Sequence, residues 1–194
     1  RLLIDQHRLD WDIAWEITNR SVAYTNHTLL PEALEKWDLS LFKNLLPRHL
    51  ELIYEINRRF LQQVRLKYPG NDSILRKLSI IDEEGGKAIR MAHLATIGAH
   101  HVNGVAALHS DLIKRQLLPE FAELWPEKFT NVTNGVTPRR WVALANPELS
   151  KLLDKEIGPN WITNMDLLLE LEKKENDSNF LDLFASAKLS GKRK

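Results

Sequence analysis

The chain has 194 residues, 43% hydrophobic and 27% charged, an ordinary globular composition that excludes a disordered tail or a fibrous repeat. Its 27 lysines and arginines nearly balance its 26 aspartates and glutamates, so the net charge of +1 gives no field to attract nucleic acid or an anionic membrane. The absence of cysteine excludes a disulfide scaffold, a thiolate nucleophile and a cysteine-ligated zinc site, and it fits a cytoplasmic location. Apolar runs are far shorter than the ~18 residues that a membrane-spanning helix needs.

The two ends of the sequence indicate a piece of a longer protein. The first residue is Arg1 rather than methionine, and the apolar residues Leu2–Ile4 lead directly into a helical pattern. At the other end, Gly191–Lys194 follows a helical pattern without a stop signal. We therefore expect the function to belong to a longer parent protein.

The first half of the chain is predicted to be mostly helical. Apolar residues recur every three to four positions from Trp11 to Tyr24 and again from Leu39 to Tyr68. Pro47 marks either a kink in the second of these helices or its true start. Between them, the polar segment Thr25–Thr28 breaks the pattern. Two shorter helices are predicted, at Glu32–Lys36 after Pro31 and near Asp72–Leu78.

The second half is predicted to alternate strands and helices. Arg90–Ile97 partly alternates and is interpreted as a strand that runs into Gly98, followed by a helix from about Val105 to Leu117. Phe129–Val136 is interpreted as a second strand, after which Thr137 caps a helix that has Pro138 at its first position. This repeated order predicts an α/β fold with a predominantly helical surround. Further helices are predicted at Pro147–Gly158, Met165–Lys173 and Asp177–Leu189.

Four histidines, His93, His100, His101 and His109, fall close together in the sequence and raise the question of a metal site. Their spacing contains neither an H-E-x-x-H motif nor a helical pair four residues apart, and no carboxylate lies among them at ligand spacing. We therefore interpret them as packed or hydrogen-bonded histidines and predict no metal site.

The glycine-bearing loop Gly98–Gly104 separates the first predicted strand from its helix. Backbone N–H groups at such a turn can hold an anion. The loop lacks the G-x-G-x-x-G pattern and a P-loop lysine, and close packing of the strand on the helix explains its glycines equally well.

The segment Thr133–Trp141, which reads TNGVTPRRW, carries a more specific combination of residues. Asn134 ends a predicted strand, where open α/β sheets bind ligands. A neutral amide suits a sugar hydroxyl, and the guanidinium groups of Arg139 and Arg140 suit phosphate. The alternative is a capped helix with a surface pair of arginines.

A polar cluster, Ala23–Thr28, interrupts an apolar helix and is followed by Pro31–Ala33. Histidine, asparagine, threonine and glutamate at such a break have the chemistry of a polyol-binding wall. Alternatively, Asn26 and Thr28 satisfy backbone groups at the helix end.

Taken in order, four motifs closely resemble the α-glucan phosphorylases, the family of glycogen, starch and maltodextrin phosphorylases. The resemblance runs from about Leu9 to about Leu189. The motifs that carry it are Ala23–Thr28 with Pro31–Trp37, then Leu45–His49, Val102–Ala106 and Thr133–Trp141.

This resemblance implies a homodimeric parent enzyme that transfers a terminal glucosyl unit from an α-1,4-glucan to inorganic phosphate, giving glucose 1-phosphate. It also implies pyridoxal 5'-phosphate as a cofactor, whose phosphate acts as acid and base toward the substrate phosphate. The implied fold is a two-domain, Rossmann-like glycosyltransferase (GT-B-type) with a cleft between the domains. Residues 1–134 correspond to the C-terminal part of the N-terminal, glucan-side domain, and residues 135–194 to the beginning of the C-terminal, cofactor-side domain.

The resemblance also assigns residues to the sugar and to the cofactor. The backbone carbonyl of His27 faces the reacting glucose, and Asn134 holds a sugar hydroxyl, so these two groups are expected to converge on one hexose pocket. The remaining implied contacts are Thr28, Glu32 and Ala33 near the sugar, and Arg140 and Trp141 beside the pyridoxal phosphate.

A surface glycogen-storage site in animal members of the family has a pattern that Asn57, Glu83 and Lys87 match. Arg58 departs from this pattern, because the family has glutamine beside the asparagine.

The family's cofactor lysine lies downstream of this segment, so no catalytic residue is assigned here. We predict that the segment alone neither holds the cofactor covalently nor turns over glucan. The alternative is a standalone, non-catalytic helical module that binds glucan or another protein. Nucleic-acid binding is excluded by the charge balance and by the lack of a basic face that carries aromatic residues.

Overall fold

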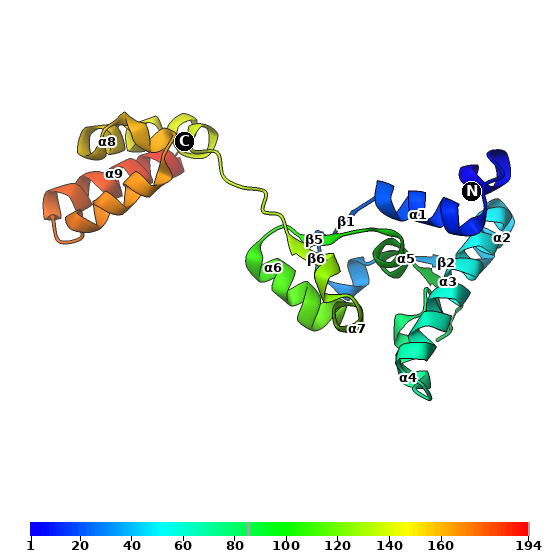
Figure 1. Cartoon of the computed structure of the whole chain (residues 1–194). Coiled ribbons are helices and arrows are strands. Elements are labelled where there is room, and N and C mark those ends of the chain that lie inside the picture. Colours follow the sequence, from blue (N-terminus) through cyan, green and yellow to red (C-terminus); the bar gives the residue numbers. More distant parts are fainter. Residues whose placement is uncertain (85, 194) are drawn as a thin grey trace. The chain divides into compact units, whose positions relative to one another are not determined.

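The computed structural model describes residues 1–84 and 86–193 and is predominantly helical (Figure 1). Its contacts divide the chain into two compact units, Arg1–Asn134 and Gly135–Lys194. The assignment of residues 1–134 to a glucan-side domain and of 135–194 to a cofactor-side domain stays a prediction, and Lys194 itself lies outside the described residues. Across the described ranges, no helix combines the length and the apolar character needed to cross a membrane.

A three-stranded parallel sheet lies in the first unit. Its strands are β1 (Tyr24–Thr25), β5 (Val102–Gly104) and β6 (Phe129–Asn131), in the order β1-β5-β6. The register pairs Tyr24 with Val102 and Val102 with Phe129. Because all three strands run in the same direction, their carboxyl ends lie at one edge of the sheet. Figure 1 shows the three strands side by side.

A second, antiparallel sheet in this unit has the order β2-β4-β3, from β2 (Lys36–Asp38), β4 (Ala88–Arg90) and β3 (Ile81–Asp82). The buried carboxylate of Asp82 joins all three strands, because it lies 2.9 Å from Lys36 Nζ and 2.9 Å from Arg90 Nη2. Burial raises the pKa of Asp82, but the hydrogen bonds from Lys36 and Arg90 outweigh it and lower this pKa to about 2.

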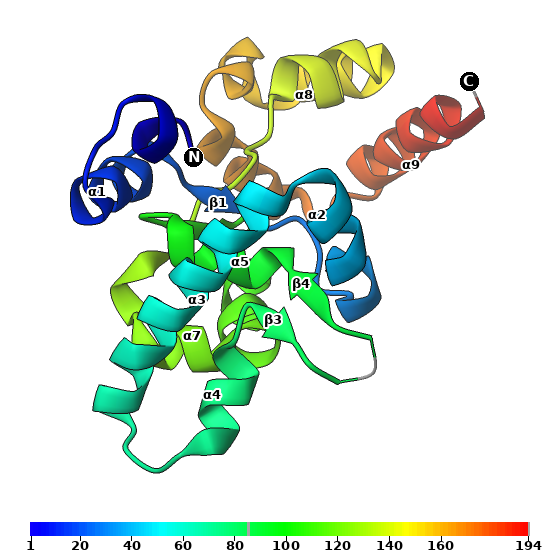
Figure 2. The ribbon, with the colours of Figure 1, turned by 90° about the vertical axis from the view of Figure 1, so that its right-hand side faces the viewer.

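The helix α3 (Pro47–Lys67) forms one wall of the core. It begins at Pro47, so this proline marks a true start, and α2 (Leu39–Leu45) is a separate helix. The next helix, α4 (Asp72–Leu78), contacts α3 (Figure 2) and is capped by Asn71, whose Oδ1 accepts a hydrogen bond from Ile74 N. The buried side chains of α3 are Leu50, Ile53, Phe60 and Val64.

The described part of the first unit holds four further α-helices, together with shorter 3-10 and π-helical turns. The predicted helix near residue 11 is confirmed as α1, and the predicted helix after residue 105 is confirmed but shorter, as α6 continued by a π-helical turn at Ile113–Leu117. The bounds are α1 (Trp11–Ser21), α5 (Met91–Gly98), α6 (Ala107–Leu112) and α7 (Pro119–Leu124).

In the second unit, α8 (Pro147–Ile157) packs against α9 (Ser178–Arg193). The side chain of Asn146 caps α8 by accepting a hydrogen bond from Leu149 N, and Gly158 ends it with φ of 77°. The indole of Trp161 is fully buried, and its Nε1 donates to Asp154 Oδ1 at 2.8 Å. The predicted helix at Met165–Lys173 is a 3-10 helix, Met165–Lys174.

The prediction of a strand at Arg90–Ile97 is wrong. Only Arg90 belongs to a strand, the end of β4, and the helix α5 begins at Met91. Ala92 and Thr96 are buried four residues apart, and Thr96 Oγ1 donates to Ala92 O at 2.7 Å, which is a helical relation. A short apolar run rich in alanine, leucine and methionine fits both periods, and here helix propensity prevails.

Two other predicted elements differ from the structure: a predicted α-helix is a 3-10 turn, and a predicted strand is shorter. The predicted helix Glu32–Lys36 is a 3-10 turn, Pro31–Ala33, because Lys36 pairs with Arg90 in the antiparallel sheet instead. The predicted strand Phe129–Val136 ends at Asn131, where the neighbouring β5 also ends. Strand pairing, which the local sequence does not encode, decides both outcomes.

His93 on α5 is half-buried, and it is neutral at neutral pH. Its Nδ1 lies 3.0 Å from Ser79 O, and the ring meets the edge of Phe121 at 5.1 Å between centroids. Burial, reinforced by the charge of Arg90, lowers the pKa of His93 to about 4, although contacts with backbone carbonyls and Glu120 oppose the shift.

Stability should therefore fall as the pH drops from about 6.5 to about 4, because over this range the unfolded chain binds a proton at His93 that the folded chain does not. We expect a loss of about 3 kcal/mol from this group. Urea unfolding at pH 7 and pH 4.5 measures it, and His93→Gln should remove this part of the acid sensitivity. The exposed His101→Gln is the control; equal pH dependence in all three proteins would contradict the prediction.

Candidate functional site

The carboxyl edge of the parallel sheet carries two segments predicted to bind sugar. Beyond β1, Asn26 N donates to Asn103 O at 2.9 Å, and beyond β6, Val132 N donates to Gly104 O at 3.1 Å. His27 therefore follows one outer strand and Asn134 follows the other, so both segments leave the sheet at the same edge. This is the edge at which α/β sheets bind ligands.

Asn26 shapes the turn that presents His27. Its side chain is only 2% exposed, its Oδ1 accepts a hydrogen bond from Thr28 N at 3.1 Å, and its Nδ2 donates to Tyr24 Oη at 3.1 Å. His27 itself is exposed. The sequence left Asn26 either in a polyol-binding wall or satisfying backbone groups at a helix end, whereas the structure shows its side chain holding a turn after a strand. The signal was its place between a strand-forming tyrosine and an exposed histidine.

The middle strand is fixed by similar polar contacts. Thr25 Oγ1 donates to Asn103 Oδ1 at 2.8 Å, which ties β1 to β5. A Cβ atom at Gly104 would lie 2.8 Å from the backbone N and Cα of Ser110, so only glycine lets α6 approach the sheet. At Gly98 an added Cβ would meet only Trp15, at 3.9 Å. Packing therefore explains Gly104 in the loop Gly98–Gly104 without a bound anion.

The remaining predicted sugar contacts lie after β1. Thr28 is half-buried, and its Oγ1 accepts a hydrogen bond from Leu30 N at 3.1 Å. Glu32 and Ala33 are exposed in the 3-10 turn Pro31–Ala33, and Asn134 is exposed at the end of the first unit. Sugar binding by these residues, and the convergence of His27 and Asn134 on one pocket, stay predictions.

The predicted storage-site residues surround the antiparallel sheet. Asn57 on α3 uses its amide internally, since its Oδ1 accepts from Ile80 N at 2.8 Å and its Nδ2 donates to Ser79 Oγ at 3.2 Å. Glu83 is exposed after β3, and Lys87 is exposed before β4. Asn57 thus has a structural role that the sequence did not indicate, and glucan storage at these residues stays a prediction.

In the second unit, Arg140 and Trp141 lie in a π-helical turn, Arg139–Leu144. Trp141 is 65% exposed, and the Arg140 guanidinium carbon lies 5.8 Å from the centroid of its ring. An exposed guanidinium suits a phosphate group, and an exposed indole suits the face of an aromatic ring. The residues predicted to contact the cofactor therefore have the donor chemistry that a phosphorylated aromatic cofactor needs.

Three of the four histidines singled out by the sequence make hydrogen bonds with the backbone. His100 Nδ1 lies 3.2 Å from Asn19 O, and His109 Nδ1 accepts a hydrogen bond from Val105 N at 3.1 Å. Together with the contact of His93 with Ser79, this confirms three of them as hydrogen-bonded histidines. In the part of the chain that the structure describes, no three histidine, aspartate or glutamate side chains are placed to hold a metal ion.

Comparison with known proteins gives a consistent result along the whole chain. The family model described as carbohydrate phosphorylase matches residues 1–194. The chain is 62% identical over 172 residues to a glycogen phosphorylase of Synechocystis sp., which covers 89% of this chain and 20% of the relative. It is 51% identical over 192 residues to a glycogen phosphorylase of Chlamydia trachomatis, and this match covers 99% of the chain and 24% of the relative. It is 48% identical over 194 residues to the muscle form of glycogen phosphorylase of Oryctolagus cuniculus, and this match covers 100% of the chain and 23% of the relative. The chain thus spans about a fifth to a quarter of these relatives.

Replacement of Asn26 tests whether its amide holds the turn at His27. Asn26→Ala leaves Thr28 N and Tyr24 Oη without their partner in a buried site, so we expect a loss of about 1–3 kcal/mol in the free energy of unfolding. Urea denaturation measures this loss. Asn44→Ala, which changes an exposed asparagine of α2, is the matched control. If both variants unfold like the wild type, Asn26 does not hold the turn.

Proposed function

The chain belongs to the carbohydrate phosphorylase family, and on this premise we propose that it is a segment of an α-1,4-glucan phosphorylase that transfers terminal glucosyl units to inorganic phosphate. The observation that supports this most strongly is the family match over residues 1–194 together with 48–62% identity to proteins named glycogen phosphorylase. The segment supplies sugar-binding groups rather than the whole reaction, since it spans only 20–24% of those relatives.

In this proposal the carboxyl edge of the parallel sheet positions the reacting glucose. The carbonyl of His27 accepts a hydrogen bond from one of its hydroxyl groups, and the amide of Asn134 donates to or accepts from another. Asn26 fixes the turn before the sugar arrives, since its buried side chain already hydrogen-bonds to Thr28 and Tyr24. A carbonyl held in place in this way needs little reorganisation as charge develops on the sugar, and hydroxyl contacts that strengthen in the transition state accelerate the reaction.

The proposed cofactor is pyridoxal 5'-phosphate. When bound, its phosphate supplies a group that exchanges a proton with the substrate phosphate. Within this chain, Arg140 would balance the negative charge of the cofactor phosphate and Trp141 would contact its ring. We assign no residue of this chain to covalent attachment of the cofactor.

The alternative is a non-catalytic helical module that binds glucan or another protein. Large apolar side chains are exposed in both units, among them Leu45, Leu66, Leu108, Leu144 and Leu169 at 63% or more. Such surface is typical of a face that contacts other protein, and it fits a segment of a larger enzyme as well as an interaction module. The homodimeric state and the cytoplasmic location of the parent stay predictions from the family resemblance.

Asn134 offers a direct test in the full-length enzyme that contains these residues. Asn134→Ala removes one sugar contact, so kcat/KM for phosphorolysis of maltoheptaose should fall about 10- to 100-fold, as expected for an unpaired polar group in a sugar site. Asn176 is exposed in the second unit, and the control variant Asn176→Ala should leave kcat/KM unchanged. Equal kcat/KM in the Asn134 variant and the wild type would contradict the assigned role.

The 194-residue chain alone should release no glucose 1-phosphate from maltoheptaose and phosphate, with or without added pyridoxal phosphate. The physical reason is that we assign to the segment sugar and cofactor contacts, but no residue that holds the cofactor covalently. A coupled assay for glucose 1-phosphate checks this, with the full-length enzyme as positive control. Turnover by the purified chain that depends on phosphate would overturn the assignment of an incomplete site.

A further inference from the structure

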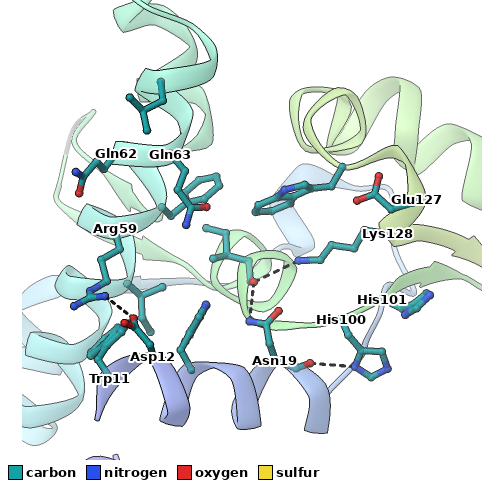
Figure 3. Close-up of a pocket in the computed structure, with 16 residues that line it drawn as sticks. Trp11, Asp12, Asn19, Arg59, Gln62, Gln63, His100, His101, Glu127 and Lys128 are labelled. Atoms are coloured by element: carbon teal, nitrogen blue, oxygen red, sulfur yellow. Dashed lines mark hydrogen bonds and ion pairs between the residues drawn. The ribbon is translucent and has the colours of Figure 1, made fainter.

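A cavity of about 780 Å³ lies in the first unit, away from the residues assigned to the reacting sugar (Figure 3). Its walls are α1, α3 and the residues that precede two strands of the parallel sheet. His100 and His101 come directly before β5, and Glu127 and Lys128 come directly before β6. Because the strands are parallel, the cavity lies at the amino edge of the sheet, and His27 and Asn134 follow the opposite edge.

Three tryptophans give the cavity broad apolar surfaces. Trp11 and Trp15 on α1 have nearly parallel rings with centroids 6.4 Å apart, and Trp125 lies on the wall before β6, tilted against Phe60 at 5.4 Å. Within the described residues, the indole N–H groups of these three tryptophans have no hydrogen-bond acceptor. Each therefore offers an apolar face and an unused donor.

Two glutamine side chains line the cavity together with these rings. Gln62 and Gln63 project from α3, both exposed, and their amides have no partner in the described parts of the chain. Figure 3 shows Gln63 and Lys128 extending from facing walls toward the middle of the cavity. An amide combines two donors with an acceptor, which matches a pair of neighbouring hydroxyl groups.

The cations of the cavity, Arg59 and Lys128, already have partners within the protein. Arg59 Nη1 lies 3.0 Å from Asp12 Oδ1, and Arg59 Nε lies 2.6 Å from Glu55 Oε1, while its guanidinium stacks 4.9 Å above Trp11. Lys128 Nζ donates to Thr96 O at 2.8 Å and lies 4.2 Å from the centroid of Trp125. Burial also lowers the pKa of Lys128 to about 8. Because the cations already have partners, the cavity favours a neutral polar ligand over an anion.

We propose that this cavity binds a short stretch of α-glucan, as a peripheral site separate from the one at the carboxyl edge. A sugar chain is neutral, its hydroxyl groups pair with planar amides, and its apolar ring faces pack on indoles. The volume is in the range of small-ligand sites. The choice of α-glucan as the ligand rests on the proposed function. The site also differs from the predicted storage site, because Asn57 faces Ser79 and Ile80 rather than this cavity.

Titration of the ¹⁵N-labelled 194-residue chain with maltoheptaose tests the proposal through its six tryptophan indole signals. The signals of Trp11, Trp15 and Trp125 should shift and saturate. Trp37 and Trp161 lie outside the cavity lining and serve as internal references that should stay in place. Absence of a saturable shift at the three cavity tryptophans, at millimolar sugar, would overturn the proposal.

A double variant, Gln62→Ala with Gln63→Ala, tests the polar contacts without removing packing, because both side chains are exposed and without partners in the described chain. We expect maltoheptaose to bind about five- to tenfold more weakly, the effect of one or two lost hydrogen bonds. Gln116→Ala, an exposed glutamine outside the cavity lining, should bind like the wild type. Unchanged affinity in the double variant would count against the site.

The outcomes separate this proposal from the proposed function. One outcome is that the NMR signals of the cavity indoles do not shift while the full-length Asn134→Ala enzyme loses phosphorolysis. This outcome would overturn the peripheral site alone. Saturable shifts at the cavity, together with a full-length wild-type protein that shows no phosphorolysis, would overturn the proposed function and support the sugar site.

Discussion

The parallel pairing of β1, β5 and β6 is the constraint on which the rest of the first unit depends. Three short strands in one register place His27 and Asn134 at one edge, although 107 positions separate them in the sequence, and place His100 and Lys128 at the other. Neither edge forms without the middle strand, and the middle strand depends on Gly104, where any side chain would meet the backbone of Ser110. A single packing contact thus supports both candidate sites.

Asparagine side chains perform much of the local positioning in both units. Asn26 holds the turn at His27, Asn57 holds the start of β3 against α3, and Asn146 caps α8 and also donates to Ala187 O on α9. In each case the amide satisfies a backbone group that would otherwise be unpaired where the chain changes direction. An asparagine in a motif is therefore not by itself evidence of a ligand. Asn134 differs because it is exposed, as a residue that meets a substrate must be.

Sequence periodicity predicted the elements whose burial pattern is local. The stripe of Leu50, Ile53, Phe60 and Val64 predicted α3, and Gly158 marked a real helix end. It failed at Met91–Gly98, where a short apolar run fits two periods and helix propensity prevails, and at Lys36–Asp38, where pairing with a distant strand decides the structure. At the site, motifs identified the segments of the carboxyl edge. The amino-edge cavity was not predictable, because its walls come from four separated segments and only the fold assembles them.

Only a short stretch of backbone separates the amino and carboxyl edges of the parallel sheet. Strands of two or three residues span roughly 10 Å or less, so the loop that lines the cavity and the turn that presents His27 are joined through one short, buried stretch. Val102 in that stretch is fully buried, and His101 O accepts a hydrogen bond from Tyr24 N, directly before the residues that Asn26 fixes. The residues that line the cavity and the turn that presents His27 therefore share one short stretch of backbone. Close-packed protein interiors transmit strain rather than absorb it, so this shared stretch gives the two ends of the sheet a physical connection.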